Sequence, residues 1–456
     1  MSNLNATLSV AVGALAAEQG ALTETANNVA NINTPGYSRK EPQFAENPPI
    51  VLGPLTFGTG VSLENTAGIR DPILQLRIQQ ETGTQGELTA FVNAMQQVQA
   101  QFNNQGSDIG TQITALFSSL SQLSTNPASI PLRQSVLTAA SNLASTISNT
   151  ANNLTAQQSN LDLSVSQAVS QVNTLTQQIA KVNGQIAALQ NLHQDASTFV
   201  DQRDVLINQL SSLIDVSEIR TESGISLTTS NGTALVDGTQ AFALTTQPDI
   251  SGHQHIFAQG NDITSQLSSG ELGGLLQVRD QQIPSLLTSL DTLASGISNS
   301  FNAANAAGFD LNGNPGGNIF VPPASGQGAA ASMAVAITDP TLIAASSDGS
   351  AGSNGNLANF SGLQSQNSIN GQTPSDFYAN LIFNVGNSVS NGSAEQQGSQ
   401  AVLQQLQDQR GSISGVSLDE EAAHMVQYQQ AYDAAARVVT TVNQMLQTVI
   451  NMGTTP

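Results

Sequence analysis

Both ends of the chain carry apolar residues at the spacing of an α-helix that hides one face. Near the N-terminus the stripe advances in steps of three and four residues, with Glu18 and Thr25 at its two polar positions. Its apolar members are Leu4, Leu8, Ala11, Leu15, Leu22, Val29 and Ile32. The C-terminal stripe is unbroken and consists of Met425, Tyr428, Tyr432, Ala435, Val439, Val442, Leu446 and Val449. Because an isolated amphipathic helix is only marginally stable in water, each stripe requires a partner.

The sequence also marks where these two helices end and begin. The N-terminal helix is predicted to stop before Pro35, because proline cannot continue a helix and Pro35-Gly36 fits the centre of a type II turn. The C-terminal helix is predicted to start near Asp419, Glu420 and Glu421, whose charges favour the positive end of a helix dipole. The two helices can belong to one monomeric core or to a separate terminal bundle. Their placement at the extremes of a 456-residue chain favours the separate bundle.

The middle of the chain is predicted to be a helical domain made of non-adjacent segments. Its clearest heptad stripe lies within 131–191, and two consecutive four-residue steps at 157–165 predict a stutter or a helix break. Further helices are expected over 86–124, 199–214, 275–305 and 396–411.

Two segments interrupt the helical pattern. Short alternating apolar runs and the turn signal Asn231-Gly232 predict a β insertion. A later segment that is rich in Gly, Ser, Asn and Pro indicates a second insertion, either β or irregular.

The sequence therefore predicts a mainly α fold with β insertions, in an elongated molecule of several domains. The terminal helices would form a coiled-coil-like core, beside a long helical bundle domain and small outer β domains. The predicted order is an N-terminal core helix and Pro-Gly turn (1–45), an extended connector (46–85), the first part of the helical domain (86–216), a β insertion (217–270), a return helix (271–307), a second β or irregular insertion (308–375), a last helix of the helical domain (376–412) and a C-terminal core helix (413–456).

Charge and composition narrow the classes of partner. The net charge is −21, with 11 basic residues and 32 acidic ones. Nucleic-acid binding requires clustered Lys and Arg, and an anionic membrane surface would repel the chain, so neither is an expected partner. The absence of cysteine excludes disulfides, thiolate metal sites and cysteine nucleophiles. No apolar run is long enough for a transmembrane helix, and the N-terminus lacks the pattern of a secretory signal, so export would use another route.

Two short patterns invite a metal-binding interpretation. His253-Gln254-His255 could place both imidazole rings on one face of a strand, but no cysteine lies nearby and the closest carboxylates are not at a diagnostic spacing, so two exposed loop histidines are the expected arrangement. Residues 310–314 resemble the start of a calcium loop, but Pro315 and Val321 occupy the positions that require Gly and Glu. A tight turn with Asx hydrogen bonds is the expected structure there.

One further cluster contains titratable residues. Asp419, Glu420, Glu421 and His424 form an acidic patch, which we interpret as a charged helix start rather than a catalytic set. No nucleotide-binding, nucleophile-elbow or zinc-protease motif occurs. The sequence therefore predicts no enzyme, no catalytic residue, no cofactor and no metal site.

The turn after the first helix resembles a motif of bacterial flagellar axial proteins. Residues 26–39 read Ala-Asn-Asn-Val-Ala-Asn-Ile-Asn-Thr-Pro-Gly-Tyr-Ser-Arg, and the ending Thr-Pro-Gly-Tyr-Ser-Arg is most similar to the FlgK family of first hook-associated proteins. Residues 414–432 resemble the C-terminus of that family, and residues 270–280 and 308–313 resemble its middle. Rod and hook proteins do not share this middle.

The resemblance implies a structural subunit that joins the flagellar hook to the filament. It implies an extracellular location on the bacterial flagellum, reached by type III export without a cleaved signal peptide. The implied partners are other copies of the chain in a ring or helical layer, the hook protein, the next hook-associated protein and a cytoplasmic chaperone on the C-terminal helix. The terminal helices would form the inner core of the tube, and the insertions would face outward.

The expected assembly interface follows from the two stripes and the turn. It consists of Leu4, Leu8, Leu15, Leu22, Val29, Ile32, Asn33, Pro35, Gly36, Tyr37, Met425, Tyr428, Tyr432, Val439, Val442, Leu446 and Val449. Two alternatives stay open at this point. One is a hook or rod protein, and the other is an axial protein that displays an adhesin or hydrolase in the segments 217–260 and 312–370.

Overall fold

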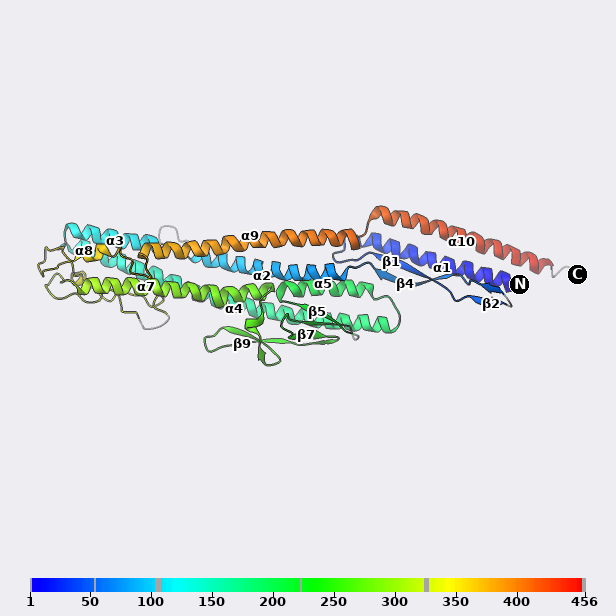
Figure 1. Cartoon of the computed structure of the whole chain (residues 1–456), viewed down its shortest axis with the longest axis horizontal. Helices are drawn as coiled ribbons and strands as arrows, with labels where there is room; N and C mark the ends of the chain where they lie inside the picture. Colours follow the sequence, from blue (N-terminus) through cyan, green and yellow to red (C-terminus); the bar gives the residue numbers. More distant parts are fainter. Residues whose placement is uncertain (1, 53–54, 103–107, 222–223, 324–327, 453–456) are drawn as a thin grey trace. The chain divides into compact units, whose positions relative to one another are not determined.

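The computed structural model describes residues 2–52, 55–102, 108–221, 224–323 and 328–452 (Figure 1). The chain divides into two compact units. The first comprises Met1–Thr84, Gln171–Ala243 and Ser399–Pro456, and the second comprises Gln85–Ser170 and Leu244–Gly398. Three long helices contribute residues to both units: α2 (Pro72–Phe102), α4 (Ile130–Asn191) and α9 (Pro374–Ser414). The mainly helical fold with small sheets that the sequence predicts is confirmed.

In the first unit, the two terminal helices lie beside each other. Helix α1 (Ser2–Ala30) packs against α10 (Leu418–Met452) and against a hairpin of β1 (Lys40–Glu46) and β4 (Val61–Gly68) (Figure 1). The hairpin is antiparallel, pairs Lys40 with Gly68, and has a bulge between Gln43 and Phe44. A second hairpin, β2 (Ile50–Leu52) and β3 (Leu55–Phe57), extends the connection between its strands.

The first unit also contains α5 (Ser197–Leu213) and a four-stranded sheet. The sheet has the order β5 (Ser217–Thr221), β6 (Gly224–Thr228), β7 (Ala234–Asp237) and β8 (Gln240–Ala241). The Asn183 side chain of α4 donates hydrogen bonds to the carbonyls of Gly238 (2.8 Å) and Ile225 (3.3 Å), and so attaches the sheet to the helix.

The second unit packs helices around a small aromatic core. Phe301 of α7 (Ile283–Ala306) contacts the rings of Phe117, Phe320 and Phe360, with centroids 5.7, 5.9 and 5.9 Å away. Its other elements are α3 (Ile109–Thr125), α6 (Gly270–Gln277), the π-helical turn η2 (Val278–Gln282), α8 (Leu357–Gly362), the 3-10 turns η1 (Thr264–Gln266) and η3 (Pro340–Leu342), and a sheet of β9 (Leu244–Pro248), β10 (Gln254–Ala258) and β11 (Asn261–Asp262).

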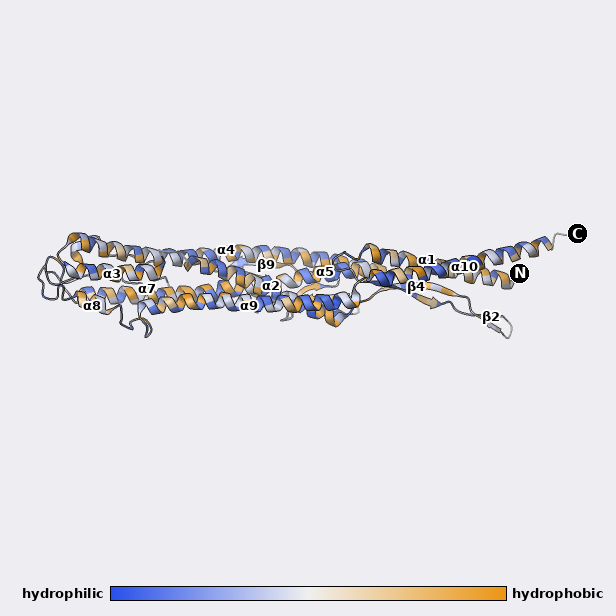
Figure 2. Cartoon of the chain, turned by 90° about the horizontal axis from the view of Figure 1, so that it is seen from above, coloured by the Kyte–Doolittle hydropathy of each residue, from blue (hydrophilic) through white to orange (hydrophobic). Residues whose placement is uncertain are grey.

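Figure 2 shows hydrophobic and hydrophilic residues interspersed along the long helices, as amphipathic segments require. Helix α4 is continuous through 157–165, so the helix break considered there is wrong. The two residues at the irregular step are buried but hydrogen-bonded: Gln157 donates to Gln97 Oε1 (2.7 Å) and Gln158 donates to the Arg279 carbonyl (2.9 Å). A polar pair with partners therefore accommodates the irregular step within an intact helix.

For the irregular segments, the structure corrects one expectation and decides between the alternatives of another. The connector expected to be extended through residue 85 becomes helical at Pro72. The reason is local: the Asp71 carboxylate accepts hydrogen bonds from the Ile73 and Leu74 N–H groups (2.9 and 3.1 Å), and proline suits a first helical position. In the described part of 308–375, the backbone forms only isolated β-bridges and short helices, so this insertion is irregular rather than a sheet.

Candidate functional site

Helix α10 presents its predicted stripe to α1. Along that stripe Val442 is buried, and Met425, Tyr428, Tyr432, Val439 and Leu446 are half-buried. Val449 lies outside the contact and is exposed. The chain therefore covers this apolar stripe only in part.

The most buried face of α1 overlaps only in part with the stripe that its leucines define. Leu4, Leu8, Leu15, Leu22 and Val29 are half-buried, and Ile32 is exposed. The deepest positions are Ala11, Ala17, Ala21, Thr25 and Asn28.

The reason for this difference is that α1 has two partners. Helix α1 contacts both α10 and the β1–β4 hairpin, and most of its deepest positions carry small side chains. Gly20 shows how close the hairpin lies, because a Cβ atom there would come within 2.5 Å of Leu63 Cδ2.

Beside its inward stripe, α10 has a second row of apolar residues that are 41–71% exposed. We call this row the α10 flank. Its members are exposed and stand at helical spacings of seven, four and three residues: Val438, Met445, Val449 and Met452. An uncovered apolar row on a helix is typical of a surface that packs against another protein.

The turn after α1 is fixed by Gly36. Its φ of +83° lies in the left-handed region, and a Cβ atom there would come within 2.2 Å of Val205 Cγ2 on α5. Arg410 of α9 donates to the Gly36 carbonyl at 2.7 Å. Of the other predicted turn residues, Asn33 and Pro35 are exposed, and Tyr37 is half-buried.

A polar node joins the N-terminal turn to the start of α10. We define the polar node as Asn28, Tyr37, Arg39, Lys40, Glu420 and Glu421. The Asn28 amide nitrogen donates to the Lys40 carbonyl (2.9 Å) and to Glu421 Oε2 (3.0 Å). The Asn28 amide oxygen accepts from the Tyr37 hydroxyl (2.8 Å) and from the Lys40 N–H (3.0 Å). Asn28 is 1% exposed, and both its amide nitrogen and its amide oxygen have hydrogen-bond partners, as a buried polar side chain requires.

Arg39 supplies the charged part of the polar node. Its Nε donates to Glu421 Oε1 at 2.8 Å, and its Nη1 donates to Glu420 Oε2 at 2.6 Å. The backbone N–H of Arg39 donates to the Ser414 carbonyl at 2.8 Å. One residue of the N-terminal motif thus holds two of the three acidic residues at the start of the C-terminal helix.

Burial changes the protonation behaviour of residues around the node. Burial, together with the carboxylates of Glu24, Asp201 and Glu421, raises the pKa of the Tyr37 phenol. Burial also raises the pKa of Glu24, which lies 3.9 Å from the Lys40 ammonium. Tyr37 is therefore a neutral hydrogen-bond donor at physiological pH.

The acidic patch at Asp419–Glu421 has more structure than a charged helix start. Two of its carboxylates are ion-paired with Arg39, which the sequence interpretation missed. A signal was present, since Arg39 is the first basic residue of the chain and belongs to the motif at 26–39. Nothing in the sequence, however, says which carboxylate it meets.

The two patterns with a metal-binding interpretation have structural partners instead. His253 Nδ1 lies 3.1 Å from Asp162 Oδ2, and His255 Nδ1 lies 2.6 Å from Asp262 Oδ2. Across the described ranges, no group of three or more His, Cys, Asp or Glu side chains is arranged to hold a metal ion. Asp310 accepts hydrogen bonds from the N–H groups of Asn312 and Asn314, both at 2.8 Å, which confirms the Asx turn. Within the same ranges no helix is both long and apolar enough to cross a membrane.

Three family models match the chain. One described as a flagella basal body rod protein matches residues 8–37, and one described as the C-terminal part of the flagellar basal body rod FlgEFG proteins matches residues 409–452. Both cover the terminal segments that the polar node joins. The third, the helical domain of the flagellar hook-associated protein FlgK, matches residues 95–320. Together these matches define a structural protein of the bacterial flagellum.

Relatives over the full length agree with this class. The chain is 29% identical to flagellar hook-associated protein 1 of Bacillus subtilis (strain 168), with 97% of each chain covered. It is 25% identical to flagellar hook-associated protein 1 of Escherichia coli (strain K12), with 97% of this chain and 98% of the relative covered. The solved structure of the flagellar hook junction protein FlgK from Burkholderia pseudomallei has the same fold, with a TM-score of 0.67 and 18% identity over 74% of this chain and 100% of that chain. Over nearly its whole length, the chain is thus similar to flagellar hook-associated protein 1, FlgK.

Proposed function

We propose that this chain is a structural subunit that joins the flagellar hook to the filament, and that it acts through its terminal helices rather than through catalysis. The observation that carries the proposal is the state of the terminal pair. Helices α1 and α10 contact each other, yet their apolar stripes stay half-exposed and the α10 flank is exposed. Fully burying an exposed aliphatic side chain contributes about 1.5–3 kcal/mol, and each of these partly exposed side chains would gain a share of that on stacking, so stacking of subunits is favoured.

The proposal assigns a role to each predicted interface residue. The half-buried leucines of α1 and the stripe of α10 would pack within and between subunits in the core of the tube. The polar node would set the angle at which the two helices leave the rest of the chain. The two insertions would lie on the outside of the tube.

The partners follow from this role. They are other copies of the chain, the hook protein on one side and the next hook-associated protein on the other. A cytoplasmic chaperone would cover the exposed apolar residues of α10 before export, because an uncovered apolar row promotes aggregation. The mature location would be the hook–filament junction outside the cell, reached without a cleaved signal peptide.

A hook or rod protein is the main alternative, because the models that match the two ends describe rod proteins. The match of residues 95–320 to the FlgK helical domain favours the junction role. An adhesin or hydrolase displayed on an axial protein has no specific observation in its favour.

Electron microscopy of a strain that lacks this protein tests the proposal. We expect intact hooks without filaments, and we expect the wild-type chain to restore the filaments. Loss of the hooks themselves would favour the alternative. The Leu446→Asp variant should fail to restore filaments, because it places a charge in the apolar contact of α10.

A further inference from the structure

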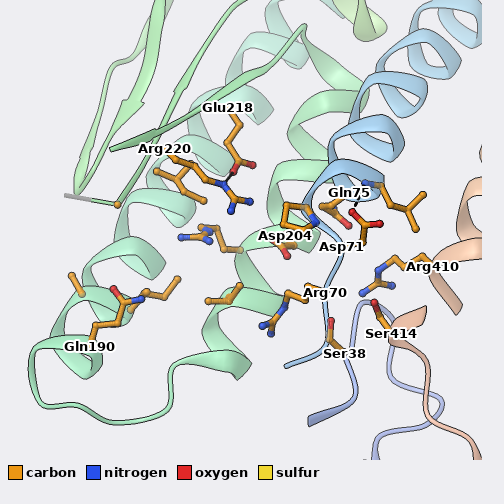
Figure 3. Close-up of a pocket in the computed structure, with 18 of the residues that line it drawn as sticks. Ser38, Arg70, Asp71, Gln75, Gln190, Asp204, Glu218, Arg220, Arg410 and Ser414 are labelled. Atoms are coloured by element: carbon orange, nitrogen blue, oxygen red, sulfur yellow. Dashed lines mark hydrogen bonds and ion pairs between the residues drawn. The ribbon is translucent and has the colours of Figure 1, made fainter. Parts of the chain in front are cut away.

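A cleft of about 610 Å³ lies where the turn after α1, the start of α2, α5 and the end of α9 meet (Figure 3). All of its lining residues belong to the first compact unit. Four arginines line it, which are Arg70, Arg203, Arg220 and Arg410. Three carboxylates, those of Asp71, Asp204 and Glu218, line it as well. The cleft thus gathers four of the 11 basic residues of an acidic chain beside three of its 32 acidic ones.

Two of these arginines are already paired. Arg70 Nη2 lies 2.7 Å from Asp201 Oδ1, and Arg220 Nε lies 3.0 Å from Glu218 Oε1. The Asp71 carboxylate, which also lines the cleft, accepts the hydrogen bonds at the start of α2. The charges of these groups are therefore engaged within the chain.

The other two arginines have no carboxylate within 4.0 Å in the described part of the chain. Arg203 is 8% exposed, its Nε has no hydrogen-bond partner, and its Nη1 makes only a 3.4 Å contact with Asn183 Oδ1. Arg410 donates one hydrogen bond, to the neutral carbonyl of Gly36. A guanidinium in a shielded cleft gains most from a carboxylate or another oxyanion, because the low dielectric strengthens a charge-assisted hydrogen bond.

Two neutral donors accompany Arg410. Ser414 lies four residues after Arg410 on α9, on the same helix face, and Ser38 lies in the turn (Figure 3). Ser38 is 2% exposed and Ser414 is 4% exposed, yet neither hydroxyl has a hydrogen-bond partner among the described residues. The backbones of both residues are hydrogen-bonded, to Asp201 and to the N–H of Arg39. This corner of the cleft therefore offers a fixed guanidinium and two hydroxyl groups to a group that accepts several hydrogen bonds.

We propose that the cleft binds the carboxylates of an acidic peptide segment on a neighbouring subunit, with Arg410 as the charged donor and Ser38 and Ser414 as neutral donors. The planar fork of a guanidinium matches a carboxylate in two parallel hydrogen bonds. Carboxylates are also the charged groups that a second copy of this chain presents most often, at 32 Asp and Glu against 11 Lys and Arg. The inference rests on the proposed function, because it requires subunits that pack side by side.

The test uses the purified full-length chain and a capped tetraglutamate peptide as the probe, with binding measured by isothermal titration calorimetry at low salt. Arg410→Gln should weaken binding about tenfold or more, since it removes a hydrogen bond to a charged group. Arg77→Gln is the matched control, because Arg77 is an exposed arginine of α2 outside the cleft and the charge change is the same. The control should bind the peptide as the wild type does, and a capped tetraglutamine peptide should not bind.

Three results would overturn the inference. One is no binding of tetraglutamate by the wild type, and another is equal binding by the wild type and Arg410→Gln, with circular dichroism showing both folded. The third is inorganic phosphate binding at least as tightly as the peptide, which would identify a site for free anions. A different result would contradict the proposed function. A chain that binds the peptide normally but does not restore filaments would count against the junction role and leave the cleft proposal standing.

Discussion

Asn28 shows how one side chain organises the end of a helix. Its amide connects the hydroxyl of Tyr37, both backbone groups of Lys40 and the carboxylate of Glu421. An amide is suited to this position because it has both donors and an acceptor at a point where α1 ends and the chain reverses. An aspartate there would place two carboxylates in contact, since the Asn28 nitrogen lies 3.0 Å from Glu421 Oε2.

Replacing Asn28 by alanine should lower the free energy of unfolding by about 2–4 kcal/mol, because each buried polar group left without a partner costs about 1–3 kcal/mol. Urea denaturation of the purified variant measures the change. Asn5→Ala removes an exposed amide from the same helix and should change the free energy by less than about 0.5 kcal/mol. Equal effects at both positions would show that the polar node does not stabilise the chain.

Asp204 lines the cleft that contains Arg70, Arg203, Arg220 and Arg410, which we call the arginine cleft. This residue gives a pH-dependent prediction. Burial raises the pKa of this carboxyl group from 3.8 to about 6, despite the opposing charges of Arg203 and Arg70. Because the folded state holds the proton more tightly, stability is lost as the pH rises from about 3.8 to about 6.

The Asp204→Asn variant removes this penalty. It should be more stable than the wild type by about 1–3 kcal/mol at pH 7.5, and this gain should disappear near pH 3.5. Thermal or urea unfolding at the two pH values measures the difference. Asp433→Asn, at an exposed position of α10, should show no such pH dependence. A gain that is equal at both pH values would contradict a penalty from ionisation.

At the scale of elements, α10 has two apolar rows. The inward row contacts α1, whereas the flank of Val438, Met445, Val449 and Met452 is exposed. An internal core needs only one row, so the flank is the part of α10 at which the proposed role would place a neighbouring subunit.

A charge on the flank should separate folding from assembly. Met445 is 50% exposed, so Met445→Asp should change the free energy of unfolding by less than about 0.5 kcal/mol and yet prevent the restoration of filaments. Gln444→Asp adds the same charge one residue away on an exposed polar position, and should restore filaments normally. Filaments in both strains would show that the flank is not part of the interface. Destabilisation of the Met445→Asp monomer would show that Met445 packs inside the chain.

The elements were predictable from the sequence to different degrees. The stripe of α10 was predicted well because this helix has one principal partner, so its period marks the covered face. On α1 the leucines marked only part of the covered face, because the spacing of apolar residues does not show how many elements a helix packs against. Helix α1 also packs against the hairpin, and small residues such as Ala17 and Ala21 are buried on it. The hairpin itself was missed, since strand β1 contains Pro42 and charged residues at both ends and gives no clear alternation.

The polar node was beyond sequence reasoning for a different reason. Arg39 and Glu421 are 382 positions apart in the chain, and any of the 32 acidic residues could have been the partner of that arginine. Local patterns identify a helix cap or a turn, but a contact at this separation depends on how the whole first unit folds. The motif at 26–39 indicated where the polar node lies, but it did not indicate which residues form its hydrogen bonds and ion pairs.

At the scale of the whole molecule, net charge opposes assembly. Each chain carries −21, so approaching subunits repel one another over the Debye length, which is about 30 Å at 0.01 M salt and about 8 Å at 0.15 M. In the proposed assembly, the attraction comes from apolar rows in direct contact, which salt does not weaken. The ion pairs proposed for the arginine cleft would also act at short range, and a shielded ion pair is screened much less than exposed charges.

Addition of purified chain to isolated hooks should therefore accelerate several-fold between 0.01 M and 0.15 M sodium chloride, because long-range repulsion between acidic subunits is removed before contact. Light scattering or electron microscopy of capped hooks over time measures the rate. Potassium chloride at equal ionic strength should have the same effect, which distinguishes screening from binding of a particular ion. Addition that slows with salt would mean that opposite charges draw the subunits together. In that case the arginine cleft, rather than the two terminal helices, would govern the first encounter.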